Sequence, residues 1–560
     1  MLNDLKNNLQ KLLAEALKSQ FPNEGDVPTI ELEVPSDKKH GDFSCNVAMK
    51  SAKVLRKAPI AIAEDLIECI NEAISKSDLD CLIENVEVKA LGFINFFVSS
   101  QAFHLILKEI FEKKGDYGKS DLGKGKKIQI EFVSANPTGP LSVAHARQAV
   151  VGDVLGNILK AIGFDVAKEY YVNDGGNQIN ILGKSIELRA LEHLGETVEF
   201  PEECYQGEYI KDMAELFLKD NKVTFVDQVN QDALWAGKVR DFGVKYLLDV
   251  IRTELSDFGV NFDIWSYESK VATKELTTGI IEKLKEKGFV YEKDGALWFK
   301  STDFGDDKDR VVKKSDGSFT YLAPDIVYHK NKFDRGFDGL INIWGPDHHG
   351  YIPRIKAAVQ ALGKDQSALD VLIVQLATIY RNGEVVSMST RKGQYISLRE
   401  VMDEVGVDAA RFFFLMRHIK MHLEFDLELA KKQTAENPVY YIQYAHARVF
   451  SINEKANNLG IEVNSSDFSL LKEKEEFELI KKLGGFNDTL VFCYEQLDPY
   501  ALISYLQELA TLFHKLYDCH RVVDPENVEL SAQRLALINA ARIVLGDGLD
   551  LLGVSAPLKM

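Results

Sequence analysis

The apolar positions of residues 1–115 predict a small domain of mixed helix and strand. Near the start, leucines recur at helical spacing and indicate an amphipathic helix, whose apolar face carries Leu2, Leu5, Leu9, Leu12, Leu13, Ala16 and Leu17. Further along, the segment "VEVKALGFINFFVSS" alternates apolar and polar residues and is broken at Gly92, as in a pair of strands. We therefore expect an N-terminal α+β domain that ends at about residue 115.

From residue 128 onward, strand-like and helix-like patterns alternate. "IQIEFV" precedes a helical pattern at about 142–162, and "DVAKEYYV" precedes another from about 177. Later, "GLINIW" leads into a helix from about 348, and the apolar run "LDVLIVQLA" follows. This alternation predicts a parallel sheet with helices on its faces.

Other stretches mark the boundaries of that sheet domain. The Gly- and Lys-rich stretch Lys113–Lys127 indicates a linker, and a long charged insertion with its own helices falls at about 190–315. Beyond about residue 400 the strand patterns fade, and "VDAARFFFLMRHI" and "ALISYLQELATLFHKLYDCHRVV" indicate helices. The sequence thus predicts three domains, at 1–115, 116–400 and 401–560, the last of them all-α.

Composition narrows the class of protein. Apolar residues make up 46% of the 560 residues and charged residues 27%, as in globular proteins. No apolar run approaches the roughly 18 residues of a membrane span, and the N-terminus has the features of neither a signal nor a transit peptide. The six cysteines are scattered without a C-x-x-C pair, which fits a reducing compartment and argues against a cysteine zinc site. We expect a cytoplasmic protein.

The net charge of −18 argues against a protein that coats nucleic acid nonspecifically. It leaves room for a protein that binds one folded RNA through local basic patches.

The stretch "EFVSANPTGPLSVAHARQAVVGD", residues 131–153, combines features of a phosphate site. A strand ends in a Pro/Gly turn and feeds a helix, whose first N–H groups and positive dipole end suit a phosphate. His145 falls in the first helical turn, where it can donate to a phosphate oxygen. Small residues at Ala144, Ala146 and Ala149 allow a base or ribose to approach closely. The alternative is an ordinary strand–helix junction with a surface histidine.

The same stretch resembles the HIGH-signature segment of class I aminoacyl-tRNA synthetases, in the form of bacterial arginyl-tRNA synthetases. Further segments of this family follow in its order: "YYVNDGGNQI", "YLAPDIVYHKNKFDRGFD", "IWGPDHHGYIPRIKAA", "VSMSTRKG", "NPVYYIQYAHAR" and the terminal "LLGVSAPLKM". "HGDFSCNVAMKSAK" and "GFINFFV" resemble the family's N-terminal tRNA-contacting domain. The resemblance spans essentially the whole chain and implies a Rossmann-like catalytic core with a helix-bundle anticodon-binding domain.

The signature departs from the family pattern at its cations and at its first histidine. Ser142 stands where the signature has its first His, Ala144 replaces its Gly, and His145 remains. The KMSKS-like loop lacks both lysines, and the resemblance implies that a lysine before the signature strand stands in for one of them. The catalytic candidates are therefore His145 with Lys126, Lys127, Arg391 and Lys392. The ATP-binding residues implied are Ala135, Asn136, Pro137, Thr138, Gly139, Pro140, Leu141, Ser142, Val143, Ala144, His145, Met388 and Ser389.

The resemblance also implies an arginine site made of Glu131, Ser134, Asn136, Tyr321 and Asp325. Tyr321 and Asp325 lie four residues apart, so on a helix they share a face. A carboxylate within "IQIEFV" must be paired or face a site, which singles out Glu131. His348 is expected to contact the amino acid or the ribose. A metal site at His348 and His349 is the alternative, but no third ligand is spaced suitably, and we expect Mg²⁺ only on the ATP phosphates.

The C-terminal helices are expected to read the anticodon of tRNA(Arg). In "YYIQYAHARV" the aromatic side chains suit stacking on unpaired bases, and Tyr440, Tyr444 and Arg448 are the candidates. Packing of these tyrosines in the core is the alternative. The family resemblance implies a monomer.

Three functions follow from these patterns. The first is arginine–tRNA ligation with L-arginine, ATP and tRNA(Arg). The second is a class I synthetase for another amino acid, against which the two carboxylates Glu131 and Asp325 argue. The third is a non-catalytic tRNA-binding relative, suggested by Ser142 and the absent lysines.

Overall fold

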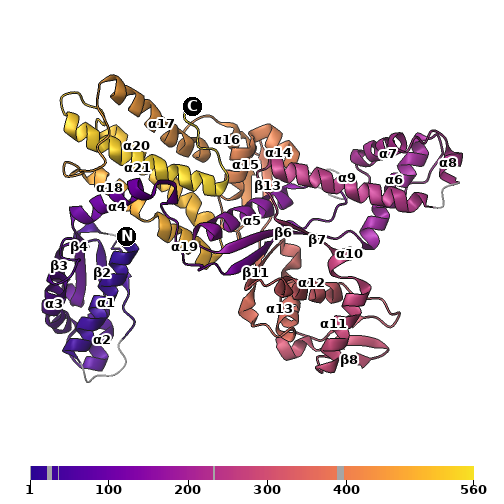
Figure 1. Ribbon diagram of the computed structural model, residues 1–560, viewed down its shortest axis with the longest axis horizontal. Coiled ribbons are helices and arrows are strands. Elements are labelled where there is room, and N and C mark those ends of the chain that lie inside the picture. Colours follow the sequence, from indigo (N-terminus) through magenta and orange to yellow (C-terminus); the bar gives the residue numbers. More distant parts are fainter. Residues whose placement is uncertain (1, 22–27, 36, 231–233, 387–395) are drawn as a thin grey trace.

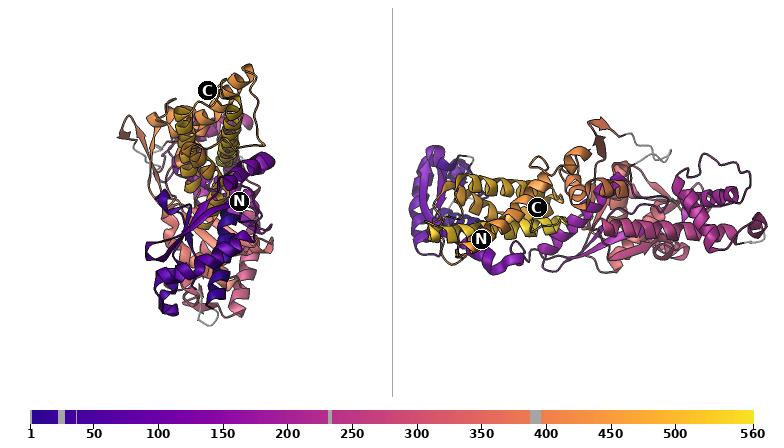
Figure 2. Two further views of the ribbon diagram at one scale, coloured as in Figure 1. Left: turned by 90° about the vertical axis from the view of Figure 1, so that its left-hand side faces the viewer. Right: turned by 90° about the horizontal axis from the view of Figure 1, so that it is seen from above.

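The computed structural model describes residues 2–21, 28–35, 37–230, 234–386 and 396–560. It is elongated: a parallel sheet lies at its centre, the N-terminal domain at one end and a helical arm at the other (Figures 1 and 2). The N-terminal domain has four strands in the order β1-β2-β4-β3, all antiparallel. Its elements are α1 (Leu2–Gln20), β1 (Leu32–Glu33), β2 (Phe43–Cys45), α2 (Val47–Leu55), α3 (Pro59–Ser75), β3 (Ile83–Lys89), β4 (Phe93–Val98) and α4 (Ser100–Lys113).

The central sheet confirms the predicted strand–helix alternation. Five parallel strands lie in the order β12-β11-β5-β6-β7. The chain adds β6 and β7 on one side of β5, and later adds β11 and β12 on its other side. Its elements are β5 (Lys127–Glu131), α5 (Val143–Ala161), β6 (Asp165–Val172), β7 (Ile264–Tyr267), β11 (Gly339–Trp344), α13 (Ile352–Ala361) and β12 (Leu369–Ile373). The helix α5 lies close against the sheet. Gly152 faces the buried Phe132 ring so closely that the Cβ atom of any other residue at this position would lie only 2.3 Å from the ring.

The single insertion expected at about 190–315 is two separate units, because β7 lies between them and belongs to the central sheet. The first is the arm, made of α6 (Gly176–His193), α7 (Glu208–Asp220), α8 (Val226–Asn230) and α9 (Trp235–Asp257). The second contains α10 (Glu268–Val271), α11 (Lys274–Glu286), β8 (Val290–Lys293), β9 (Ala296–Phe299) and β10 (Arg310–Lys313). It packs beside α12 (Leu322–Asp334) and α13 (Figure 1). The sequence analysis did not predict β7, because this strand has only four residues and lies within the charged stretch that was interpreted as an insertion.

The region after residue 400, predicted to be all-α, is mostly helical but contains a strand after α15 (Val407–Phe414) that the sequence pattern did not reveal. β15 (Leu423–Asp426) pairs in parallel with β13 (Ala377–Arg381), which in turn pairs with β14 (Glu384–Val385). Around it lie α14 (Leu398–Val405), α15 and α16 (Leu427–Lys431). The helix bundle itself comprises α17 (Pro438–Asn458), α18 (Lys474–Gly484), α19 (Phe486–Gln496), α20 (Tyr500–Cys519) and α21 (Val528–Leu552). In the described part of the chain, no helix is long and apolar enough to cross a membrane.

Candidate active site

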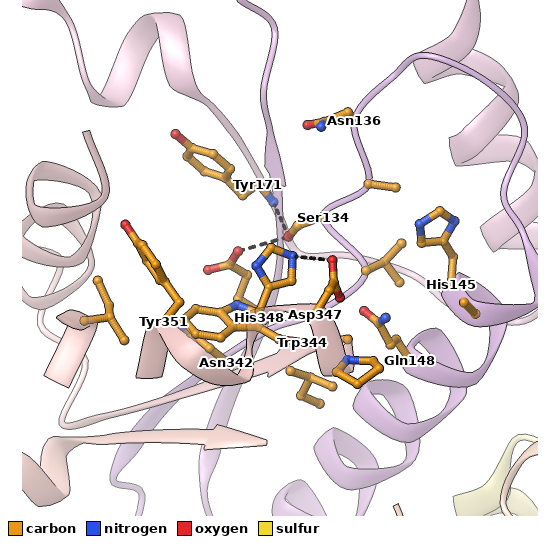
Figure 3. A pocket seen from close by; sticks show the side chains of 18 of the residues that line it. Ser134, Asn136, His145, Gln148, Tyr171, Asn342, Trp344, Asp347, His348 and Tyr351 are labelled. Atoms are coloured by element: carbon orange, nitrogen blue, oxygen red, sulfur yellow. Dashed lines mark hydrogen bonds and ion pairs between the residues drawn. The ribbon is translucent and has the colours of Figure 1, made fainter. Parts of the chain in front are cut away.

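A cavity of about 570 Å³ opens at the carboxyl ends of β5 and β11. β5 and β11 are neighbouring parallel strands, and the order of strands along the chain reverses between them. Open parallel sheets hold their ligands at such a point. Figure 3 shows His145 and Gln148 of α5 on one side of the cavity and Tyr171 and Tyr351 on the other.

The loop that leaves β5 is held in a strained backbone conformation. Val133 and Ser134 both adopt positive φ, at 66° and 41°, which is unusual for a residue with a β-branched side chain such as Val133. The turn places the Ser134 hydroxyl between two partners. It donates to Glu131 Oε1 at 3.1 Å and accepts the backbone N–H of Tyr171 at 3.1 Å (Figure 3).

Glu131 lines the cavity but already has a cation. Its Oε2 accepts a hydrogen bond from Lys332 Nζ at 2.5 Å, and Lys332 is completely buried. The same ammonium donates to Asn342 Oδ1 at 2.9 Å, and Asn342 contacts His329 at 2.9 Å. The sequence predicted that Glu131 is either paired or faces a site. In the structure it does both: it lines the cavity, and Lys332 neutralises its charge.

Asp325 is a carboxylate that lines the cavity and forms no ion pair with a described residue. Among the residues that the structure describes, no lysine, arginine or histidine forms an ion pair with it, and its Oδ2 accepts the Tyr351 hydroxyl at 2.5 Å. Burial raises the pKa of Asp325 to about 7. The nearby carboxylates Glu131 and Glu268 also raise this pKa, whereas the Tyr351 hydrogen bond and the charge of Lys332 lower it. Glu268, whose pKa is also raised by burial, accepts the Tyr171 hydroxyl at 2.9 Å. This side of the cavity therefore favours a buried cation.

His145 occupies the opposite side, in the first turn of α5. Burial lowers its pKa to about 4, so the imidazole is neutral near pH 7. Its Nδ1 accepts the backbone N–H of Ser142 at 3.1 Å. A neutral ring whose Nδ1 accepts carries its proton on Nε2. His145 therefore presents an N–H donor, beside the positive end of the α5 dipole.

Comparison with known proteins agrees with this geometry. Residues 106–449 match the family described as tRNA synthetases class I (R), catalytic domain. Residues 7–98 match the arginyl tRNA synthetase N terminal domain, and residues 442–560 the DALR anticodon binding domain. The chain belongs to the class I arginyl-tRNA synthetases.

Individual relatives are similar over their full length. The arginine–tRNA ligase of Bacillus pumilus is 45% identical over 553 residues, 98% of each chain. That of Geobacter sp. strain M21 is 47% identical over 574 residues, covering 99% of this chain and 100% of the relative. A solved structure titled as a putative arginyl-tRNA synthetase from Campylobacter jejuni matches with a TM-score of 0.75 and 35% identity, over 82% of this chain and 100% of the other. The arginyl-tRNA synthetase of Thermus thermophilus, at 22% identity, shares the fold with a TM-score of 0.75, over 99% of this chain and 100% of the other.

Within this synthetase, some residues of the predicted ATP segment reach the cavity and others do not. Ala135, Asn136, Ala144 and His145 line it. Leu141 and Val143 are 1% exposed and their side chains belong to the apolar core, so any contact of these two residues with a nucleotide must come from their backbone. Pro137, Thr138, Gly139, Pro140 and Ser142 are not among the lining residues, and the Thr138 carbonyl accepts the Tyr209 hydroxyl of the arm at 2.7 Å.

Of the residues predicted to bind arginine, some likewise line the cavity and one does not. Ser134, Asn136, Asp325 and His348 line the cavity with Glu131. Tyr321 does not: it caps the start of α12, it is 77% exposed, and it is not among the residues that line the cavity. Met388, Ser389, Arg391 and Lys392 lie outside the described residues.

Lys126 and Lys127 are misplaced for the role that the resemblance implied. Lys127 is the first residue of β5 and lies opposite Asp165 of the neighbouring strand β6. The cavity lies beyond Glu131, at the other end of β5. Four residues of strand span about 13 Å, and neither lysine lines the cavity. The stand-in hypothesis is therefore wrong for this arrangement, because a parallel sheet separates the two ends of its strands.

We accordingly expect Lys126→Ala and Lys127→Ala to keep kcat for arginine activation within about twofold of the wild type, as for surface changes away from a site. The measurement is ATP consumption at saturating arginine and tRNA. A selective loss of kcat in either variant would show that the lysine reaches the nucleotide after all.

Several site residues escaped the sequence interpretation. They are Gln148, Tyr171, Glu268, Lys332, Trp344 and Tyr351. Tyr171 and Trp344 end the predicted strands "DVAKEYYV" and "GLINIW", so the rule that ligands sit at carboxyl ends of strands was a usable signal for both. Glu268 and Lys332 gave no such signal, because each reaches the site from a separate helix.

The predicted anticodon residues also meet in a cavity, of about 480 Å³, between α17 and α20. Tyr440 and Tyr444 are stacked with ring centroids 6.2 Å apart, and Arg448 donates to the Tyr444 hydroxyl at 2.7 Å. The buried Nε2 of His514 in the same cavity has no hydrogen-bond partner among the described residues. These tyrosines are half-buried and line a cavity, unlike the fully buried Ile442 and Ala445 beside them on α17.

No group of three or more His, Cys, Asp or Glu side chains suited to a metal ion occurs in the described ranges. His348 lines the cavity and lies 3.5 Å from Asp347, but both side chains are mostly exposed.

Proposed function

We propose that this chain activates L-arginine with ATP and transfers the arginyl group to the 3′ end of tRNA(Arg). The observation that carries the proposal is the Asp325 carboxylate, which faces the cavity and forms no ion pair with a described residue, the nearby Lys332 being paired with Glu131. A guanidinium supplies the missing charge and offers donors in a planar fork. An apolar amino acid would leave this carboxylate uncompensated, which argues against a synthetase for such a substrate.

The chemistry needs positioning and charge stabilisation more than it needs a base. The arginine carboxylate attacks the α-phosphate of ATP, and pyrophosphate leaves. With the guanidinium at Asp325 and the phosphates at the start of α5, the amino acid spans the cavity between the two sides. The Nε2–H of His145 then donates to charge that develops on the phosphate oxygens. Mg²⁺ would be bound to the ATP phosphates as part of the substrate.

The phosphate cations are proposed to come from Arg391 and Lys392. No lysine or arginine occurs among the described residues that line the cavity. The chain that follows these two residues returns to the start of α5. Val143 N–H donates to the Ile396 carbonyl at 3.4 Å, and Leu398 N–H donates to the Leu141 carbonyl at 2.8 Å. Residue 396, where the described chain resumes, therefore lies beside the start of the helix that carries His145.

tRNA binding is proposed for the cavity between α17 and α20. Its stacked tyrosines suit unpaired bases, and Arg448 supplies a donor for a base edge or phosphate. Such local contacts are required because the chain as a whole carries a net charge of −18.

The deciding experiment is arginine-dependent formation of AMP from ATP in the presence of tRNA, followed by acid-stable attachment of labelled arginine to the tRNA. We expect both with arginine and neither with lysine or methionine. Binding of tRNA without AMP formation would instead identify a non-catalytic relative, and activation of another amino acid would identify a different specificity.

Arginine binding should depend on pH through Asp325. Because the pKa of this carboxyl is about 7 and the guanidinium stays charged, only the ionised form pairs with the substrate. We expect kcat/KM for arginine to rise about tenfold between pH 6 and pH 8, since kcat/KM reports the titration of the free enzyme. His145, with a pKa of about 4, does not titrate in this window. The Asp325→Asn variant is the control and should lose the dependence. A flat wild-type profile would contradict the prediction.

A further inference from the structure

Arg147 is a buried cation of α5, two residues after His145. It forms no ion pair among the described residues. Its side chain is 1% exposed. Burial lowers its pKa to about 10, although the charge of Asp498 acts on it and raises the pKa, so the guanidinium remains charged at neutral pH. A charge in such a place is retained only if its N–H groups are satisfied.

All of its hydrogen bonds go to backbone carbonyls of two other segments. Nη1 donates to the Gln375 carbonyl at 2.7 Å and to that of Met421 at 2.9 Å. The other two nitrogens donate to carbonyls of the segment 414–418, at 3.4 Å to Phe414, 3.3 Å to Arg417 and 3.1 Å to His418. The planar fork of arginine makes this set of contacts, which a lysine ammonium with three donors cannot reproduce.

The first of these segments leads to the phosphate side of the site. Gln375 immediately precedes Leu376, which lines the cavity, and β13, which continues through β14 towards residues 387–395. Met421 lies at the start of the β15 strand that pairs with β13. Arg147 therefore fixes the base of this strand pair against the helix that carries His145.

The second segment is held from its other side by the helical domain. Asp498 Oδ2 accepts the Ile419 N–H at 3.1 Å and contacts His418 Nδ1 at 3.1 Å. The His418 ring lies 4.2 Å from that of Tyr500, the first residue of α20. The same helix carries His514 of the proposed RNA cavity, about 21 Å further along its axis.

We propose that Arg147 is a positioning residue that sets the alignment of His145 with the strand pair β13–β14, and that α20 acts on this alignment through Asp498 and the segment 414–421. Arg147 touches no substrate, and its effect passes through the backbone that it binds. The inference rests on the proposed arginine activation. It gives a physical route by which RNA bound between α17 and α20 reaches the phosphate side of the active site.

The test compares Arg147→Lys with Arg411→Lys as a matched control. Arg411 is also fully buried and joins distant segments, through the Leu552 and Phe258 carbonyls and Asp153, but it contacts α5 eight residues beyond His145. Both variants should lose thermal stability. At a temperature well below both melting transitions, we expect Arg147→Lys to lose about tenfold or more in kcat with KM for arginine and ATP within about threefold, the mark of an interaction needed in the transition state. Arg411→Lys should keep kcat within about twofold.

Asp498→Ala tests the helical-domain half of the route. We expect it to lower tRNA-dependent kcat by about threefold or more while tRNA affinity, measured by filter binding, stays unchanged. The double variant with Arg147→Lys should lose less than the product of the single losses, because both act on one segment. Multiplicative losses, normal kcat in Arg147→Lys, or equal loss of kcat in Arg411→Lys would each overturn the inference. If Arg147→Lys does not fold, normal kcat in Asp498→Ala overturns it alone. An inactive wild type would instead contradict the proposed function.

Discussion

Replacing His145 with alanine is expected to lower kcat for arginine activation by about 100-fold or more, as for the loss of one transition-state hydrogen-bond donor. The neutral imidazole presents its Nε2–H beside the start of α5, where the proposed mechanism places the α-phosphate. KM values should change less than kcat, because the contact strengthens as charge develops on the phosphate. The measurement is tRNA-dependent AMP formation under saturating ATP and arginine.

Two further variants separate this role from helix capping, because His145 Nδ1 also accepts the Ser142 N–H. His145→Asn keeps an acceptor close to the Nδ1 position but removes the donor, and it should remain about as inactive as the alanine variant. His145→Gln places an amide N–H near the position of Nε2 and should regain part of kcat. Full activity in His145→Asn would show that His145 is only a structural cap.

Asp325→Asn is expected to lower kcat/KM for arginine by roughly 30-fold or more. Removing one partner of a buried charge pair costs about 2–5 kcal/mol, and Glu131 cannot compensate because Lys332 already neutralises it. Lysine should not become a substrate, since a compact ammonium does not fill a site shaped for a planar fork. Citrulline, which is uncharged and nearly isosteric with arginine, should lose much less or even gain. The assay is ATP consumption with each amino acid in the presence of tRNA.

Tyr351→Phe is the matched control for this second experiment. It removes the hydroxyl that donates to Asp325 Oδ2 at 2.5 Å but leaves the carboxyl group in place. Because the loss of this hydrogen bond raises the pKa of Asp325, the variants are compared at pH 8 or above, where more of the carboxyl is ionised. Arginine should remain strongly preferred over citrulline in this variant. An unchanged preference for arginine over citrulline in Asp325→Asn itself would mean that this carboxylate does not face the guanidinium.

The sequence by itself determined the elements whose patterns are local. The strands β5, β6 and β11 and the helix α5 follow their predicted positions, because alternation, apolar runs and a Pro/Gly turn are properties of neighbouring residues. The order of the family's motifs likewise led to the correct family, since it depends only on the chain. His145 and Asp325 were singled out in this way, and both line the cavity.

Only the tertiary structure decided which charges are free to act. Glu131 and Lys332 are 201 residues apart in the chain, and their pairing leaves Asp325 as the unpaired carboxylate. Lys126 and Lys127 are close to the signature in sequence, yet β5 separates them from the cavity by its own length. The Arg147 contacts join residues more than 200 positions apart along the chain. Long-range contacts of this kind leave no periodic trace in the sequence, because burial and pairing are set by the elements that the fold brings together.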